Sequence, residues 1–188
     1  MTGIAAVVLA AGSSRRFGNE NKLLALVDGK PVLSHVLDRI AELPLSETIV
    51  VVRPGDEAVI SLVGEYAASI VENHHAADGM GTSIAAGVRH AGDVDGVMVI
   101  LGDMPLIGQE TYLALLAAFQ EHADKTIVMP SCERRRGHPV LFRREHFEDL
   151  MALGDDTGAK NILAANAATL LSVPTTDAGV LADIDVPV

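Results

Sequence analysis

Apolar runs of strand length alternate with segments of helical periodicity along almost the whole chain. This alternation is typical of α/β proteins in which helices connect the strands of a mainly parallel sheet. Residues 4–10 are continuously apolar, which predicts a first strand buried on both faces. Further strands are predicted at residues 48–52, 69–72, 96–101, 126–130, 138–142 and 169–173, and helices at 32–43, 56–66, 82–91, 109–122, 144–153 and 158–165. The expected architecture is a three-layer, Rossmann-like α/β fold.

Length and composition favour one domain over residues 1–188, because no linker-like segment interrupts the pattern and 49% of the residues are hydrophobic. The apolar runs are much shorter than the roughly 20 residues that a membrane span needs, and the first residues do not resemble a signal peptide. The one cysteine, Cys132, has no partner within the chain, which suits a reducing compartment. We therefore expect a cytoplasmic protein without a membrane segment.

The formal net charge of −11 argues against a nucleic-acid-binding surface, which would require a basic face. Two basic clusters stand out against this acidic background. One contains Arg15, Arg16 and Lys22, and the other contains residues 134–136. Either cluster could be a solvated run of charge or a site for an anionic ligand.

The first strand leads into a loop of small residues, from Leu9 to Gly18, with Lys22 shortly after it. Such a loop lets the backbone approach a ligand closely, and its N–H groups can bind phosphate oxygens beside the basic side chains. The loop lacks the Gly-Lys-Ser/Thr ending of a Walker A motif and the Gly-x-Gly-x-x-Gly pattern of dinucleotide-binding proteins. It therefore predicts a triphosphate site of another kind, with an ordinary turn as the alternative.

Asp103 follows the strand predicted at residues 96–101, and a carboxylate at the rigid end of a strand is suited to hold Mg²⁺ against phosphates. Alternation along an extended segment places Asp183 and Asp185 on one side, so either could complete a metal site with Asp103. A turn aspartate and solvated tail acids are the alternatives. Of the two tail acids, Asp185 is favoured as the ligand.

The glycines Gly79 and Gly81 predict a loop that lies against a nucleobase or ribose. Thr82 or Ser83 is expected to cap the helix that follows. The neighbouring pair His74 and His75 has no third ligand at a suitable spacing, so we interpret both as surface residues.

Taken together, these segments resemble the molybdenum cofactor cytidylyltransferases of the MobA-like NTP transferase family. The resemblance covers nearly the whole chain. It rests on the loop after the first strand, Gly79-Met80-Gly81, Gly102-Asp103-Met104-Pro105, Arg136-Gly137-His138-Pro139-Val140-Leu141-Phe142, Gly154-Asp155-Asp156-Thr157-Gly158-Ala159-Lys160 and Asp183-Ile184-Asp185.

The resemblance implies transfer of CMP from CTP to the terminal phosphate of molybdopterin, with release of pyrophosphate and possible delivery to a molybdoenzyme. It implies catalytic roles for Arg16, Lys22 and Asp103, and Mg²⁺ held by Asp103 and Asp185. The nucleotide-binding residues would be Leu9, Ala10, Ala11, Gly12, Ser14, Arg16, Lys22, Gly79, Gly81 and Ser83. Arg136 and His138 would bind the pterin phosphate. The methyl group of Ala11 would narrow the base site, favouring CTP over GTP.

Three alternatives stay open at this point. The same fold and loop serve transferases that act on sugar or polyol phosphates. An apolar strand followed by a Gly/Ser loop and two arginines can also mimic the cofactor site of an NAD(P)-dependent oxidoreductase, although the glycine fingerprint is missing. A non-catalytic nucleotide-binding partner of a molybdoenzyme is the third, against which the acids Asp103 and Asp185 argue.

Overall fold

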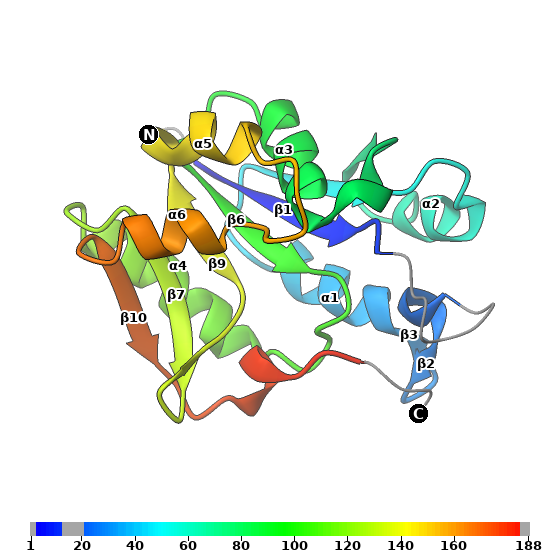
Figure 1. Ribbon diagram of the computed structural model, residues 1–188. Coiled ribbons are helices and arrows are strands. Elements are labelled where there is room, and N and C mark those ends of the chain that lie inside the picture. Colours follow the sequence, from blue (N-terminus) through cyan, green and yellow to red (C-terminus); the bar gives the residue numbers. More distant parts are fainter. Residues whose placement is uncertain (1–2, 13–20, 185–188) are drawn as a thin grey trace.

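The computed structural model describes residues 3–12 and 21–184, and it has the three-layer α/β architecture that the sequence predicts (Figure 1). An eight-stranded sheet forms the middle layer, in the order β10-β7-β9-β6-β1-β4-β5, with β8 paired to β7. The strands are β1 Ile4–Ala10, β4 Glu47–Val52, β5 Ser69–Glu72, β6 Gly96–Leu101, β7 Ile127–Cys132, β8 Arg135–Arg136, β9 Val140–Arg143 and β10 Leu170–Pro174.

Most strand pairs are parallel, as the sequence predicts. The central strand β1 pairs in parallel with β4 and with β6, β4 with β5, and β10 with β7. The exceptions are β9, which is antiparallel to both of its neighbours, β6 and β7, and the short strand β8, which is antiparallel to β7. Since β9 runs against them, the chain that enters it starts from the edge where β6 and β7 end.

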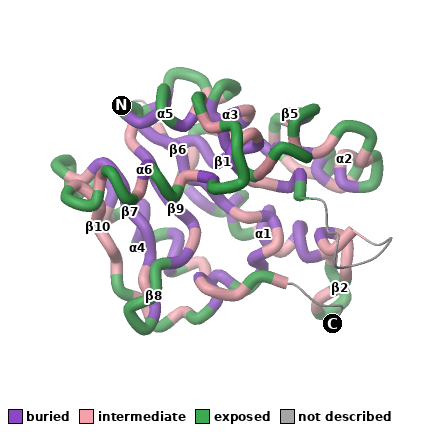
Figure 2. The backbone as a smooth tube through the Cα atoms, in the orientation of Figure 1, coloured by how far each residue is buried: buried purple, intermediate pink, exposed green. Residues whose placement is uncertain are grey.

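Helices cover both faces of the sheet. They are α1 Val32–Ala41, α2 Glu57–Val63, α3 Met80–His90, α4 Gln109–Glu121, α5 Phe147–Met151 and α6 Lys160–Ala165. Helices α1, α2 and α4 share one apolar cluster with Ala6 and Val8 of β1, whereas α3, α5 and α6 share the other with Ala5 and Val7. Successive side chains of a strand point to opposite faces, so a continuously apolar strand supplies both cores. Figure 2 shows the resulting buried centre.

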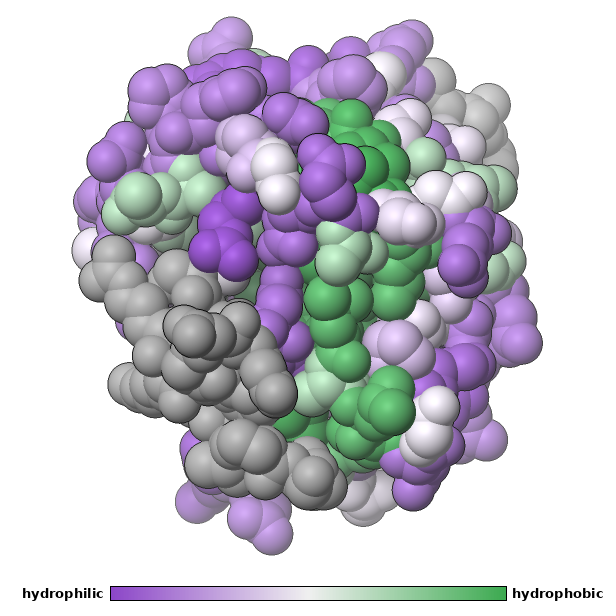
Figure 3. All heavy atoms as spheres, turned by 90° about the vertical axis from the view of Figure 1, so that its right-hand side faces the viewer, coloured by the Kyte–Doolittle hydropathy of each residue, from purple (hydrophilic) through white to green (hydrophobic). Residues whose placement is uncertain are grey.

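Several short elements are not predicted by the periodicity. Strands β2 (Leu26–Val27) and β3 (Lys30–Pro31) form a hairpin whose turn, Asp28-Gly29, has positive φ at both residues, 50° and 77°. An Asp-Gly pair is the usual signal for such a turn. Leu26 on this hairpin is 60% exposed, and Figure 3 shows apolar atoms on the side of the molecule that carries the hairpin. The remaining short elements are the 3-10 turns η2 Lys22–Leu24, η3 Ala76–Asp78, η4 Arg144–His146 and η5 Ala178–Leu181.

The start of α3 differs from the prediction. The helix begins at Met80 rather than at residue 82, and its N-cap residue Gly79 has no side chain to cap it. Thr82 lies inside the first turn, where its hydroxyl donates to the carbonyl of Gly79 at 2.8 Å. The expected capping role of Thr82 or Ser83 is therefore wrong. The helix predicted at residues 144–153 is also shorter, because its first turn is the 3-10 turn η4 and α5 ends at Met151.

Candidate functional site

Six parallel strands place the residues of interest at one edge of the sheet. Because β1, β4, β5 and β6 all run the same way, the segments after Ala10, after Glu72 and after Leu101 open onto the same edge. Strand β9 brings a further segment there, since its first residue, Val140, lies opposite Val99 near the end of β6. Ligands of open α/β sheets bind at this carboxyl edge.

Asp103 stands at the centre of this edge, two residues beyond the end of β6. The backbone N–H of Gly102 donates to the carbonyl of Leu9 at 3.0 Å, which ties the ends of β6 and β1 together. A Cβ at position 102 would lie 2.9 Å from that carbonyl oxygen, so only glycine fits. The Asp103 carboxylate is 18% exposed and forms an ion pair with the ammonium group of Lys22.

Lys22 is held in place from both sides. Asn21 caps the turn η2 by accepting a hydrogen bond from the N–H of Leu23 at 3.1 Å, and its side-chain amide donates to Asp56 at 2.7 Å. Leu23 is buried in the core. Because Lys22 is only 17% exposed and stands between two anchored residues, its charge lies at a defined place beside Asp103.

His138 lies on the other side of Asp103, in the segment that enters β9. Its backbone N–H donates to the carbonyl of Val180 at 3.0 Å. Burial lowers the pKa of the imidazole, while the nearby negative charge of Asp103 raises it. The ring atom Nδ1 is buried and has no hydrogen-bond partner within residues 3–12 and 21–184. Buried polar atoms of proteins normally have a hydrogen-bond partner.

Arg136 is exposed on β8, next to His138. Strand β8 follows a turn in which Glu133 and Arg134 have positive φ, 50° and 66°. Register pairs Arg136 with Ser131 of β7, so this hairpin lies at the carboxyl end of β7. The basic cluster of residues 134–136 therefore belongs to the same edge of the sheet as Asp103.

The glycines at the start of α3 have an explanation within the protein. Gly79 has φ of 132°, and a Cβ there would lie 2.4 Å from the backbone N of Asp156. Gly81 donates its N–H to the carbonyl of Asp155 at 2.9 Å. Both glycines thus allow close contact with another loop. Ser83 is buried and accepts a hydrogen bond from the amide of Asn73 at 3.0 Å, so its hydroxyl supports the loop after β5.

The end of β1 divides into buried and open positions. Ala10 is 1% exposed and Ala11 is 4% exposed. The methyl group of Ala11 packs in the apolar cluster on the α3 side. The narrowing of the base site by this methyl group stays a prediction. Leu9 is half-buried, whereas a Cβ at Gly12 would meet nothing within 4 Å in the part of the chain that the structure describes.

Three predicted site residues, Ser14, Arg16 and Asp185, lie outside the described residues. The chain just before Asp185 is described, and the N–H of Ile184 donates to the carbonyl of Asp103 at 2.9 Å. The other tail acid, Asp183, is exposed.

Sequence reasoning missed the residues that support this edge. Asn21 and Asp56 are one such pair, and Arg53 reinforces it with a guanidinium group 3.4 Å from the Asp56 carboxylate. Asp177 is another, with hydrogen bonds to the beginning of α4. In both cases the partners are far apart in the sequence. The side-chain types Asn and Asp were the only available signal, since they favour local capping and turns.

The residues that the structure describes contain no group of three or more His, Cys, Asp or Glu side chains that could hold a metal ion. None of the described helices is long and apolar enough to cross a membrane.

The chain combines a parallel sheet, a loop of small residues after the central strand β1, and an aspartate–lysine pair at the end of the neighbouring strand β6. These features are those of the nucleotide-binding α/β proteins. Comparison with known proteins makes this specific. The chain belongs to the family of the MobA-like NTP transferase domain, whose model matches residues 6–170.

Individual relatives agree with this membership. The bifunctional protein GlmU of Desulfitobacterium hafniense is 30% identical over 129 residues, which is 68% of this chain but only 28% of that protein. The chain therefore spans less than a third of this relative's length.

Among solved structures, Rv0371c of Mycobacterium tuberculosis has a TM-score of 0.78 at 23% identity, covering 93% of this chain and 88% of the other. Its complex with manganese has a TM-score of 0.75 at 22% identity, covering 93% and 89%. The molybdopterin-guanine dinucleotide biosynthesis protein A of Archaeoglobus fulgidus has a TM-score of 0.69 at 20% identity, covering 98% and 93%. These likenesses confirm the fold.

Proposed function

We propose that this protein is a nucleotidyltransferase that moves CMP from CTP to the terminal phosphate of molybdopterin and releases pyrophosphate. The observation that carries the proposal is the Asp103–Lys22 pair beside the loop that follows β1. It supplies one anionic group for a cation and one cationic group for phosphates at the ligand-binding edge of the sheet. Family membership favours this transferase function over the oxidoreductase alternative.

Charge governs the chemistry. An anionic phosphate of the acceptor has to attack the α-phosphorus of CTP, so two polyanions must approach each other and pyrophosphate must leave. Lys22 and the basic residue Arg16 would neutralise charge on the triphosphate. No protein nucleophile is needed, because the acceptor phosphate itself forms the new bond and the bond from the α-phosphorus to the bridging oxygen breaks.

The residues present fit a magnesium ion that is shared with the substrate. Mg²⁺ is usually held by one or two carboxylates together with phosphate oxygens rather than by a complete protein cage. The ion pair of Asp103 with Lys22 supports a place for positive charge beside this carboxylate. Asp103 and Asp185 would hold the ion, which would lower the negative charge of the triphosphate.

The acceptor side of the edge would consist of His138 and Arg136. His138 Nδ1 is buried without a partner among the described residues, and Arg136 is exposed on the adjacent strand β8. Together they offer one imidazole and one guanidinium to a phosphate. The base preference for CTP rests on the family resemblance. The methyl group of Ala11 would narrow the space that a purine needs, and backbone groups of the loop would read the base edge.

Replacing Arg136 with alanine is expected to raise the KM for molybdopterin about tenfold and to leave the KM for CTP nearly unchanged. Loss of a charge-assisted hydrogen bond weakens affinity by roughly one to two orders of magnitude. Because Arg136 is exposed and water screens its charge, we expect a loss of about one order of magnitude. Arg144→Ala is the control, since this arginine pairs with Asp93 away from the site. Equal weakening for CTP and pterin would assign Arg136 to the triphosphate instead.

Gly12→Ala is expected to leave the melting temperature within a few degrees of wild type and to raise the KM for CTP about tenfold. The added methyl group meets nothing within 4 Å among the described residues, so it intrudes on the ligand rather than on the protein. Steady-state kinetics and thermal denaturation measure the two effects. An unchanged KM would mean that the nucleotide does not approach this part of the loop.

Release of pyrophosphate tests the proposed reaction. The protein is incubated with Mg²⁺, with each of the four NTPs and with one acceptor at a time: molybdopterin, a sugar 1-phosphate or a polyol phosphate. The proposal predicts release that depends on CTP and molybdopterin together. Release with CTP and a sugar or polyol phosphate, but not with molybdopterin, would retain the transferase and reject the acceptor.

A further inference from the structure

Two chain segments lie side by side at the carboxyl edge. One is the loop of residues 103–108, which connects β6 to α4 and begins with Asp103. The other comprises residues 177–184, here called the tail segment, which contains η5 and leads directly to Asp185. Any shift of the tail segment would act on loop 103–108, and so on Asp103, which the proposed function assigns to the metal.

The two segments touch at both ends and in the middle. At one end the N–H of Ile184 donates to the carbonyl of Asp103 at 2.9 Å. In the middle, a Cβ at Gly179 would lie 2.3 Å from the carbonyl oxygen of Leu106, so the two backbones are in direct contact. At the other end, Asp177 joins the tail segment to the beginning of α4.

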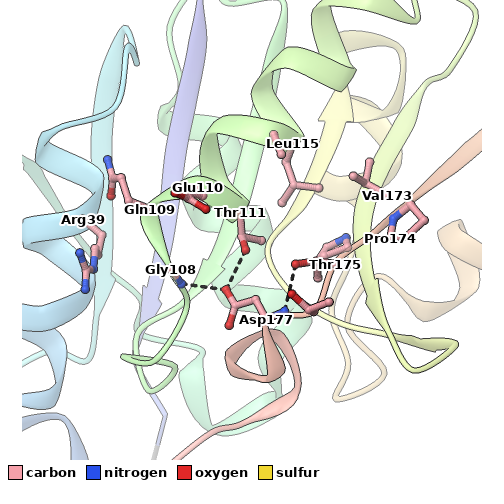
Figure 4. A pocket seen from close by; sticks show the side chains of 13 residues that line it. Arg39, Gly108, Gln109, Glu110, Thr111, Leu115, Val173, Pro174, Thr175 and Asp177 are labelled. Carbon is pink, nitrogen blue, oxygen red and sulfur yellow. Dashed lines mark hydrogen bonds between the residues drawn. The ribbon is translucent and has the colours of Figure 1, made fainter.

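Asp177 bonds to both segments through different oxygens. Its Oδ2 accepts hydrogen bonds from the N–H of Gly108 at 2.8 Å and from the hydroxyl of Thr111 at 2.7 Å, as Figure 4 shows. Its Oδ1 accepts from the N–H of Gly179 at 2.9 Å, which caps η5 within the tail segment. The N–H of Asp177 in turn donates to the hydroxyl of Thr175 at 3.1 Å.

Asp177 is not a packing residue. It borders a cavity of ≈ 840 Å³, open between the beginning of α4 and the end of β10 (Figure 4). Arg39, Gln109 and Leu115 also line this cavity. Because the carboxylate faces open space, its removal would leave no void in the core. Its loss would act through the hydrogen bonds and through the orphaned N–H groups of Gly108 and Gly179.

We infer that Asp177 is a positioning residue for the transfer reaction: it fixes the tail segment against loop 103–108 and thereby holds Asp103 in place. This inference rests on the proposed function, because it takes Asp103 as a metal ligand. Mutation of a residue that holds a metal ligand in place typically lowers metal affinity or activity about ten- to a hundredfold. Asp177 has no contact with the nucleotide in this account.

The test measures Mn²⁺ binding by electron paramagnetic resonance, in the presence of a CTP analogue with a methylene bridge between the α- and β-phosphorus. Asp177→Ala is expected to raise the Mn²⁺ dissociation constant about tenfold and to lower kcat with Mg²⁺ and CTP about tenfold. The KM for CTP should change less than about threefold, because phosphate contacts are untouched. Asp177→Asn should be intermediate, since its one carbonyl oxygen can serve either α4 or η5 but not both.

Thr126→Val is the matched control for a purely structural effect. Thr126 is buried and bonds to Thr169 and His146, just before β7 at the opposite edge of the sheet. This variant should lower the melting temperature without changing Mn²⁺ affinity. If Asp177→Ala lowers the melting temperature but matches the control in Mn²⁺ affinity and kcat, Asp177 is only a helix cap and the inference is overturned. If Asp177→Ala does not fold, Asp177→Asn is compared with Thr126→Val instead. A Mn²⁺ affinity and a kcat equal to those of this control would overturn the inference.

Asp103→Asn separates the failure of this inference from that of the proposed function. If it binds Mn²⁺ as tightly as wild type in the presence of the analogue, the assigned metal site itself is wrong. If it loses Mn²⁺ while Asp177→Ala retains it, the metal site stands and only the role of Asp177 fails.

Discussion

Asp103→Asn is expected to lower kcat/KM for nucleotidyl transfer by about three orders of magnitude while the protein still folds. The substitution keeps the size of the side chain but removes the charge that, in the proposed site, holds the cation between protein and triphosphate. Charge-stabilising groups in active sites are typically worth about a hundred- to a thousandfold. The rate of pyrophosphate release at saturating Mg²⁺ and CTP measures the effect.

The control for this variant is Asp38→Asn. Asp38 also forms an ion pair with a lysine, Lys30, but on the surface of α1. Exposed pairs contribute little to stability, so this variant should behave as wild type in the assay. Near wild-type turnover of Asp103→Asn with Mg²⁺ would refute its assignment as a metal ligand. A large fall in the melting temperature would instead point to a structural role for its pair with Lys22.

Lys22→Met is expected to lower kcat/KM by about two orders of magnitude. The ammonium group is the one described cation that the structure places against Asp103, and in the proposed mechanism it stabilises negative charge on the phosphates as pyrophosphate leaves. Methionine keeps the length and the apolar stem of the side chain without the charge. Activity assays at several CTP concentrations separate the loss in kcat from the change in KM.

Lys30→Met provides the comparison for this second variant, because Lys30 pairs with Asp38 at the hairpin β2–β3 close by in sequence. It should retain full activity. If Lys22→Met raised only the KM for CTP, Lys22 would bind the ground state and not the transition state. Full activity of Lys22→Met would remove this residue from the site.

The core of the fold follows from apolar runs that are bounded by breakers. Residues 4–10, 69–72 and 96–101 form strands with the predicted limits, and each run has a glycine or a polar residue next to it on at least one side: Gly3, Asn73 and Gly102. The beginning of α3 was less predictable. Threonine and serine usually mark a helix start, but here the glycines that permit contact with residues 155 and 156 set the boundary. The hydrophobic periodicity also could not predict that β9 is antiparallel to its neighbours, because such a pattern carries no information on strand direction.

The centre of the candidate site was predictable, whereas its supports were not. Asp103 and Lys22 stand out because a carboxylate after a buried strand and a lysine after a loop of small residues have few structural uses. Asp177 and its partner Gly108 are 69 residues apart, and Asn21 and Asp56 are 35 apart. Such bonds depend on how the helices pack on the sheet.

The most direct test of the central proposal follows the α-phosphorus of CTP. The wild-type protein is incubated with Mg²⁺, molybdopterin and CTP labelled with ³²P at the α position, and the products are separated. The account predicts that the label moves into a pterin product containing cytidine, in equal amount to the pyrophosphate released, and that Asp103→Asn abolishes both. Label that stays in CTP, or that appears only in free CMP whether or not molybdopterin is present, would contradict it.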